Sequence, residues 1–534
     1  MNQNSSSQWN WHLFTCLFGL LVAGCLLETI SIEAAASEPA PEQQEKPNIV
    51  IILADDLGYG DTSPFNPDSG IPTPNFERLA SQGMIFTDAH SGSGVCTPTR
   101  YGLVCGRYAW RTRLKRGVLA GYSKPLIDPD QQTIGGCLQT AGYHTCVVGK
   151  WHLGLGWQWK EDLPDDINNM GIPSNAPGMV DWEKPLTDGP LQHGFNNCFL
   201  FPASLDMSPY VYIKDSEVTA IPDTILDGQR FPHFYRKGEA TEGFDVADTL
   251  DDLTAAATGY IKERSATGEP FFLYFPLTAP HKPVSPHERF VGSTELGLYG
   301  DFIHQVDSTI GEVVAALEEA GVAENTLLVV TSDNGSFMYT QESLETDHVA
   351  DASVQKFNPD HHRANGHLRG TKADVWEAGH RVPFYVRWPA GMADGLAGSS
   401  NTTTICHTDL LATCCAIAGV EFDSDASPDS FDYSSLIVET GASFSRPPVV
   451  HHSAGGTFAI RKDNWKLVLG NGSGGRQQPR GTAFERPYFL FDLEADLAET
   501  NNLIESQPEI AAELQEMLIE IAGEDLPEPL KQQN

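Results

Sequence analysis

The chain has 534 residues and a formal net charge of -37, from 34 basic and 71 acidic side chains. Hydrophobic residues make up 40% of it and charged residues 20%, which supports a large core and excludes a disordered or fibrous protein. The acidic surface repels phosphate backbones and so argues against non-specific nucleic-acid binding. A pocket for an anionic ligand therefore has to be locally basic.

The N-terminus has the pattern of a targeting segment. An apolar run at residues 12–29 is followed by Ala34-Ala35-Ala36-Ser37, a small-residue cleavage pattern, so we predict a signal peptide over residues 1–36. Residues 21–25 (LVAGC) also match a bacterial lipobox, in which Cys25 is acylated. Both interpretations predict export, to the periplasm, the extracellular space or a lipid anchor at the cell surface. No later apolar run approaches bilayer length, which excludes a multi-span membrane protein.

The cysteines do not form a recognisable framework. Of the ten in the chain, two lie in the N-terminal segment, and the remaining eight contain no CxxC pair. Cys137 and Cys146 are near enough in sequence for a local disulfide, which export permits without requiring. Cys406, Cys414 and Cys415 are expected to be small buried residues of a helix.

Five short apolar runs are typical of strands buried on both faces. They lie at residues 47–54, 145–148, 271–275, 326–331 and 384–388. Amphipathic helical patterns lie between them, for example at residues 301–320, where an apolar stripe ends at Gly321. This alternation predicts an α/β sandwich with a large mixed, mostly parallel central sheet flanked by helices.

The last hundred residues have a different pattern. Residues 458–469 and 488–493 are predicted strands on either side of a Gly/Arg-rich loop at 470–480, and residues 508–522 form an amphipathic helix. We expect a small α+β subdomain with an antiparallel sheet. The predicted division is a larger domain at 45–430 and a C-terminal subdomain at 431–534.

Polar residues follow the predicted strands at four places. Asp55-Asp56 ends the first, Lys150 and His152 follow the second, His281 follows the third, and Asp333-Asn334 ends the fourth. An acid after a strand usually caps a helix or turn, but four such ends together indicate a site, because ligands of open α/β sheets bind beyond the carboxyl ends of the strands.

The acids and the amide among these residues form an all-oxygen set, namely Asp55, Asp56, Asp333 and Asn334. Hard divalent cations prefer such ligands, and zinc would more often recruit the available histidine or cysteine. The set favours calcium and leaves magnesium open.

The segment Cys96-x-Pro98-x-Arg100 predicts a cysteine at the start of a helix. Pro98 suits the first turn, and the free N–H groups of a helix N-terminus favour bound anions and thiolates. Taken alone, the segment favours an ordinary buried cysteine beside a helix start.

Taken in order, these segments resemble the type I sulfatases of the alkaline-phosphatase-like superfamily, over about residues 47–503. Cys96-x-Pro98-x-Arg100 resembles the motif whose cysteine a separate maturation enzyme oxidises to formylglycine, and residues 149–154 (GKWHLG) resemble the second signature of the family. The other matching segments are Asp55-Asp56, Asp333-Asn334-Gly335 and Leu368-Arg369-Gly370-Thr371-Lys372. Residues 270–284 and 298–314 look closest to the arylsulfatase A and N-acetylgalactosamine-6-sulfatase branch.

The resemblance implies a sulfuric ester hydrolase whose nucleophile is a hydroxyl of hydrated formylglycine, made from Cys96. It implies that His152 is the base that regenerates the aldehyde, and that His281, aided by Lys372, protonates the leaving alcohol.

The resemblance also assigns binding roles. Arg100 and Lys150 would hold the formylglycine oxygens, and calcium would act as Lewis acid and template. The implied substrate-binding residues are Lys150, His281 and Lys372, and the implied metal ligands are Asp55, Asp56, Asp333 and Asn334.

The expected substrate is a sulfated polysaccharide or its oligosaccharides. Two alternatives stay open: a phosphonate monoester or phosphodiester hydrolase with the same nucleophile and metal, and a catalytically silent, calcium-dependent binder of sulfated glycans in which Cys96 is unmodified. The loop between Asn334 and Lys372 is expected to line the substrate rim with solvated histidines, at 348, 361, 362 and 367.

Overall fold

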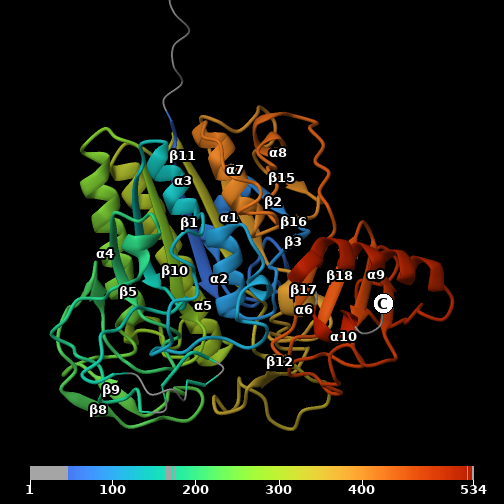
Figure 1. The fold of residues 1–534 in the computed structure, drawn as a ribbon, viewed down its shortest axis with the longest axis horizontal. Coiled ribbons are helices and arrows are strands. Elements are labelled where there is room, and N and C mark those ends of the chain that lie inside the picture. The colour runs from blue at the N-terminus through green and yellow to red at the C-terminus, as the bar shows by residue number, and fades with distance from the viewer. Residues whose placement is uncertain (1–45, 163–166, 169, 174, 526, 532–534) are drawn as a thin grey trace, which may run out of the picture. The chain divides into compact units, whose positions relative to one another are not determined.

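A ten-stranded sheet forms the centre of the molecule (Figure 1). The computed structural model describes residues 46–531 except 163–166, 169, 174 and 526, so the predicted signal peptide and Cys25 lie outside the described residues. In spatial order the strands are β15 (Ser399–Asn401), β2 (Met84–Phe86), β14 (Phe384–Arg387), β11 (Thr326–Ser332), β1 (Asn48–Asp55), β10 (Phe271–Pro280), β4 (His144–Lys150), β5 (Asn197–Phe201), β6 (Ile213–Lys214) and β7 (Glu217–Val218).

The middle of this sheet is parallel. β1 pairs in parallel with β10 and β11, β10 with β4, and β4 with β5, whereas β14 and β6 run antiparallel to their neighbours. Strands buried on both faces are continuous apolar runs, and β1 is buried at every residue except Asn48. The predicted mixed, mostly parallel sheet is confirmed.

Helices cover both faces of the sheet. Ile49, Ile51 and Leu53 of β1 pack in one core with α2 (Cys96–Cys105), α3 (Ile134–Thr140) and α7 (Asp409–Ala418). The alternate residues Val50 and Ile52 pack in another with α1 (Pro74–Gln82), α4 (Thr249–Ser265) and α5 (Gly297–Glu319). α5 begins four residues before the helix predicted at 301–320, and its stripe faces the second core as expected.

A four-stranded antiparallel sheet lies at the C-terminus, beside the red helix α9 in Figure 1. It consists of β17 (Val449–His452), β18 (Phe458–Lys462), β19 (Trp465–Leu469) and β20 (Phe489–Asp492), and α9 (Pro508–Ala522) packs against it. The single strand predicted over 458–469 was wrong. It is a hairpin, because Asp463 adopts a left-handed conformation (φ 52°) that acidic and amide residues tolerate in tight turns.

Shorter elements complete the described chain. They are β3 (Ala89–His90), β8 (Thr224–Leu226), β9 (Gly238–Ala240), β12 (Tyr339–Thr340), β13 (Lys356–Phe357), β16 (Ile405–Cys406), α6 (Glu377–His380), α8 (Ser435–Val438), α10 (Glu528–Lys531) and the 3-10 turns η1 (Ala109–Arg111), η2 (Pro190–His193), η3 (Glu288–Phe290) and η4 (Gly523–Asp525). Within the described part of the chain, no helix combines the length and apolar character needed to cross a bilayer.

The cysteines of the described residues are all buried free thiols. Cys137 contacts Cys415 and forms no disulfide with Cys146. Cys414 and Cys415 lie in α7 as predicted, but Cys406 lies in β16. The helix prediction was wrong for Cys406 because the chain turns between it and Asp409, where α7 begins.

Candidate active site

The carboxyl ends of β1, β4, β10 and β11 bring their polar residues together. Lys150 Nζ lies 2.7 Å from Asp55 Oδ2, and the backbone N–H of Asp56 donates to Asp333 Oδ1 at 3.1 Å. His281 Nε2 lies 3.7 Å from Asp56 Oδ2. The predicted convergence of four strand ends is therefore present.

Cys96 lies among these groups, at the first residue of α2. All ten residues of this helix are buried. The Cys96 thiol lies 3.7 Å from Asp55 Oδ1, and the Lys372 ammonium donates to its sulfur at 3.4 Å. Burial raises the pKa of Cys96 to about 12 despite the attraction of Lys150 and Lys372, so the unmodified residue is a neutral thiol and a weak nucleophile.

The charges beneath Cys96 are paired with one another. Arg100 donates to Asp333 Oδ2 from two nitrogens, at 2.8 and 3.2 Å, and Lys372 Nζ lies 2.6 Å from Asp56 Oδ1. Burial raises the pKa of Asp55 to about 7 although Lys150 lowers it. Burial also penalises ionised Asp333, but Arg100, Lys150 and Lys372 outweigh it and lower its pKa.

Two oxygens of this group fit a metal ion. Asp56 Oδ2 and Asn334 Oδ1 are buried and have no hydrogen-bond partner within the described part of the chain. Leaving such atoms unpaired is costly, and carboxylate and amide oxygens are the ligands of hard cations. Asp55 and Asp56 also offer ligand atoms within 4.8 Å of those of Cys96 and His281. Asp333 is tied to Arg100 and reaches the group through the N–H of Asp56.

The two predicted histidines face the same place. His152 Nε2 lies 2.8 Å from the Leu119 carbonyl, which leaves its buried Nδ1 without a partner among the described residues. His281 bonds the Lys282 carbonyl through Nδ1 and lies 3.3 Å from the Ser204 hydroxyl. Burial, reinforced by nearby lysines, lowers the pKa of both histidines well below 6.5, so both rings are neutral here.

A cavity of about 710 Å³ opens above Cys96, His152, His281 and Lys372. Six basic residues line it and a single acid, Asp206, does so. The basic residues are Arg116, Arg236, Lys282, Lys372, Arg476 and Arg480. The pocket is thus locally basic in a strongly acidic protein, as an anionic ligand requires.

Several residues of the site were missed from the sequence. Ser204, Asp206 and the carbonyl of Leu119 follow no pattern that predicts a site, whereas the glycines and arginines of loop 470–480 were a visible signal that was interpreted only as a connection. The opposite error concerns the four histidines expected at the rim: none lines this cavity, and two are buried. His348 is held by the Val354 carbonyl and His362 by Asp61, because their loop folds back onto the body.

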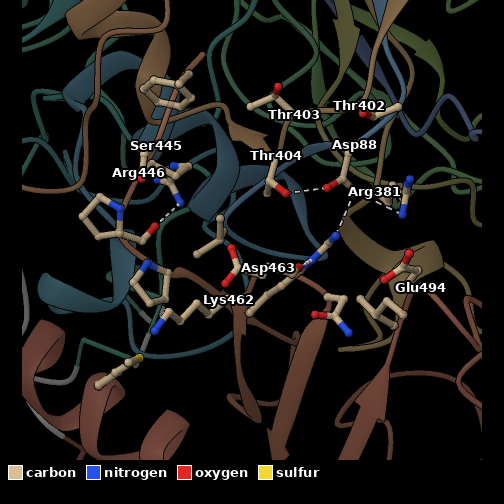
Figure 2. A pocket seen from close by; sticks show the side chains of 18 of the residues that line it. Asp88, Arg381, Thr402, Thr403, Thr404, Ser445, Arg446, Lys462, Asp463 and Glu494 are labelled. Carbon is tan, nitrogen blue, oxygen red and sulfur yellow. Dashed lines mark hydrogen bonds and ion pairs between the residues drawn. The ribbon is translucent and has the colours of Figure 1, made fainter.

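A second, larger cavity of about 1230 Å³ lies between β17, β18 and the loops around Thr404 and Arg446 (Figure 2). Asp88 at its wall pairs with Arg461 at 2.8 Å and with Arg381 at 3.1 Å, and accepts a hydrogen bond from Thr404. No residue of the predicted site lines this cavity.

The architecture, with its mixed ten-stranded sheet and small C-terminal antiparallel sheet, is that of the alkaline-phosphatase-like superfamily. A family model described as Sulfatase matches residues 47–420, and the chain belongs to this family. It is accordingly a sulfuric ester hydrolase.

Comparison with individual proteins shows which sulfatases the chain is similar to. The chain is 32% identical to an N-acetylgalactosamine-6-O-sulfatase of Bacteroides thetaiotaomicron, over 89% of this chain and 93% of that protein. It is 30% identical to arylsulfatase A of Bos taurus, over 91% of this chain and 88% of that one. A solved structure described under the metabolism of multiple glycosaminoglycans by Bacteroides thetaiotaomicron superposes with a TM-score of 0.75 at 30% identity, covering 89% of this chain and 99% of the other.

Proposed function

We propose that this sulfatase removes sulfate from sulfated polysaccharides or their oligosaccharides, with a formylglycine made from Cys96 and a bound calcium ion. The observation that carries the proposal is the position of Cys96, at the start of a buried helix and on the floor of a basic cavity. The names of the similar proteins, which act on N-acetylgalactosamine sulfate or concern glycosaminoglycans, support the substrate class.

The basic groups bind and orient the ester. Lys150 and Lys372, which lie beside the Cys96 position, screen the charge of the sulfate, with His281 on the same side. Arg100 positions this group from below, because its guanidinium holds Asp333 and the Lys150 carbonyl at once. Hydrated formylglycine at position 96 supplies a hydroxyl nucleophile that the neutral Cys96 thiol does not.

The two histidines divide the proton transfers. His281 is neutral in the ligand-free site, but an entering sulfate raises its pKa by adding negative charge, so it gains the proton that the leaving alcohol needs. His152 donates to the Leu119 carbonyl through Nε2, and its Nδ1, which has no partner among the described residues, can accept a proton as base. Asp55, Asp56, Asp333 and Asn334 would hold the calcium ion, which supplies positive charge against the transferring group.

We also propose that residues 1–36 direct export and that a maturation enzyme modifies Cys96. The small-residue pattern at residues 34–37 and the lipobox at Cys25 support export, with or without a lipid anchor.

The decisive experiment is the mass of the peptide spanning residues 91–107, from protein made in its native source or in a host with maturation machinery. We expect an aldehyde in place of the Cys96 thiol, together with sulfate release from N-acetylgalactosamine 6-sulfate glycans. An intact thiol throughout would overturn the proposal in favour of a silent glycan binder. Faster turnover of a phosphodiester than of any sulfate ester would instead favour the phosphoester alternative.

A further inference from the structure

Four of the six basic residues that line the cavity have no acidic partner among the described residues: Arg116 and Arg480, which are exposed, and Lys282 and Arg476, which are half-buried. Lys282 and Arg476 form no ion pair with any acid of the described residues, whereas Lys372 pairs with Asp56 and Arg236 with Asp206. We propose that Lys282 and Arg476 form a second anion subsite, which binds a carboxylate or a further sulfate carried by the glycan beside the ester that is cleaved. This inference rests on the proposed function and narrows its substrates to polyanionic glycans.

Lys282 is held half-buried at the cavity wall. It follows His281 directly, and its ammonium lies 4.7 Å from the centre of the Phe234 ring. Burial, followed by the charge of Arg476, lowers its pKa to about 8. A half-buried ammonium that is repelled by a second cation is stabilised by an anion placed between the two.

Arg476 is fixed in position by its backbone. The N–H groups of Arg476 and Gln477 both donate to Asp374 Oδ1, and Asp374 Oδ2 accepts the N–H of Thr371, one residue before Lys372. Gly475 packs so closely that an added Cβ would lie 2.2 Å from the Ala373 carbonyl oxygen. The loop is therefore attached to the Lys372 segment, and Arg476 is carried to the cavity by a rigid support.

The side chain of Arg476 is ready to bind an anion. Its buried Nη1 has no hydrogen-bond partner among the described residues, although a buried guanidinium nitrogen normally has one. Its charge adds to those of Lys282 and Lys372, whose pKa values it lowers after the larger effects of burial and, for Lys372, of the acids around it. Guanidinium groups bind carboxylates and sulfates through paired N–H bonds, so Arg476 suits either anion.

The test compares substrates that differ only in the second anion. The probes are N-acetylgalactosamine 6-sulfate linked to a neutral hexose, to a uronic acid, and to a hexose that carries another sulfate ester. We expect the native enzyme to prefer an acidic disaccharide over the neutral one by about tenfold in kcat/KM. The uronic acid and sulfate arms identify which anion the subsite takes.

The variants are Lys282→Gln, Arg476→Gln and the double substitution, with Lys262→Gln on the exposed surface of α4 as a control that removes the same charge. The double variant should lose the preference for acidic disaccharides, and Lys262→Gln should keep it. An unchanged preference in the double variant would overturn the inference.

A binding measurement separates this inference from the proposed function. Calorimetry of the acidic and neutral disaccharides on Cys96→Ala protein needs no turnover, and the double substitution in that background should remove the difference in affinity. Absence of sulfate release from every glycan would contradict the proposed function alone. Equal affinity for both disaccharides in Cys96→Ala protein would contradict the second subsite alone.

Discussion

The two cavities of this molecule differ in how the charged side chains along their walls are paired. The larger, about 1230 Å³, has its central acid, Asp88, between Arg461 and Arg381. The smaller, about 710 Å³, has Lys282 and Arg476 at its wall, and neither forms an ion pair with an acid in the part of the chain that the structure describes. Volume alone would select the larger cavity. Uncompensated charge instead favours the smaller cavity as the one that binds an anionic ligand.

The physical basis of the difference lies in desolvation. Burial alone would raise the pKa of Asp88, but His90, Arg461 and Arg381 lower it far below its usual value. The negative charge of Asp88 is therefore already balanced by groups of the protein itself. Lys282 and Arg476 lose part of their hydration on folding and gain no ion pair that offsets the loss. A bound anion offsets it.

The largest effect is expected from Cys96→Ala in the smaller cavity. The substitution removes the source of the nucleophile, so kcat/KM for sulfate esters should fall by at least about ten-thousand-fold. Sulfate release measured on matured protein checks this. Cys105→Ala, at the other end of the same buried helix, is the matched control and should fold and remain active. Activity within tenfold of native in the Cys96 variant would show that the smaller cavity is not the catalytic one.

In the larger cavity, Asp88→Asn should act on stability. Loss of this carboxylate leaves Arg461 and Arg381 only their longer contacts with Glu377, at 3.7 and 3.4 Å, and breaking such buried pairs costs about 3–5 kcal/mol. The urea midpoint reports the change. Asp463→Asn removes an exposed acid of the same cavity and should shift stability by less than about 0.5 kcal/mol. Equal midpoints for both variants would mean that the charges of the larger cavity are not energetically coupled.

The strand that joins the two cavities should make stability dependent on pH. β17 starts at Val449 in the larger cavity and ends at His452, two residues before Ala454 in the smaller. Burial lowers the pKa of His452 to about 4. Below pH 6.5, His452 therefore binds a proton in the unfolded chain but stays neutral in the folded one. Stability therefore falls between pH 6.5 and 4, by about 3 kcal/mol for this residue.

Unfolding across that pH range checks the contribution of β17. His452→Gln should flatten the dependence, and the exposed His367 is the control position. A slope that His452→Gln leaves unaltered would place the acid sensitivity elsewhere.

The smallest expected effect is the response to metal. Calcium at a hundred times its dissociation constant should stabilise chelator-treated protein by about 2.7 kcal/mol. Asn334→Ala removes one of the unpaired buried oxygens and should weaken the response, whereas Asn464→Ala in the larger cavity should retain it. Thermal unfolding with calcium and with magnesium measures both. No response to either ion would refute the metal site.

Much of the candidate site could be predicted because strand patterns are local. The apolar run before Asp55 and the one before Asp333 each specify a buried strand, and parallel pairing then brings their carboxyl ends to one edge. The start of α2 at Cys96 follows in the same way from Pro98.

The rest depends on contacts between distant segments. Nothing near Arg476 in the sequence shows that Asp374 holds its backbone, or that Ser204 reaches both Lys150 and His281. The histidines at 348 and 362 were misjudged for the same reason, since burial by a folded-back loop leaves no periodic pattern.

The arrangement of the central sheet also determines the order in which its strands can assemble during synthesis. β1 is made early, but Phe271 at the start of its neighbour β10 is 223 residues from the Asn48 side chain that it contacts, and the loop that carries Arg476 comes later still. A sheet whose neighbouring strands are so far apart in sequence assembles slowly. Until Lys372 has been synthesised, Cys96 lacks one of the residues that cover it. The maturation enzyme of the proposed function would therefore reach Cys96 more easily before the Lys372 segment folds over it than in the finished protein.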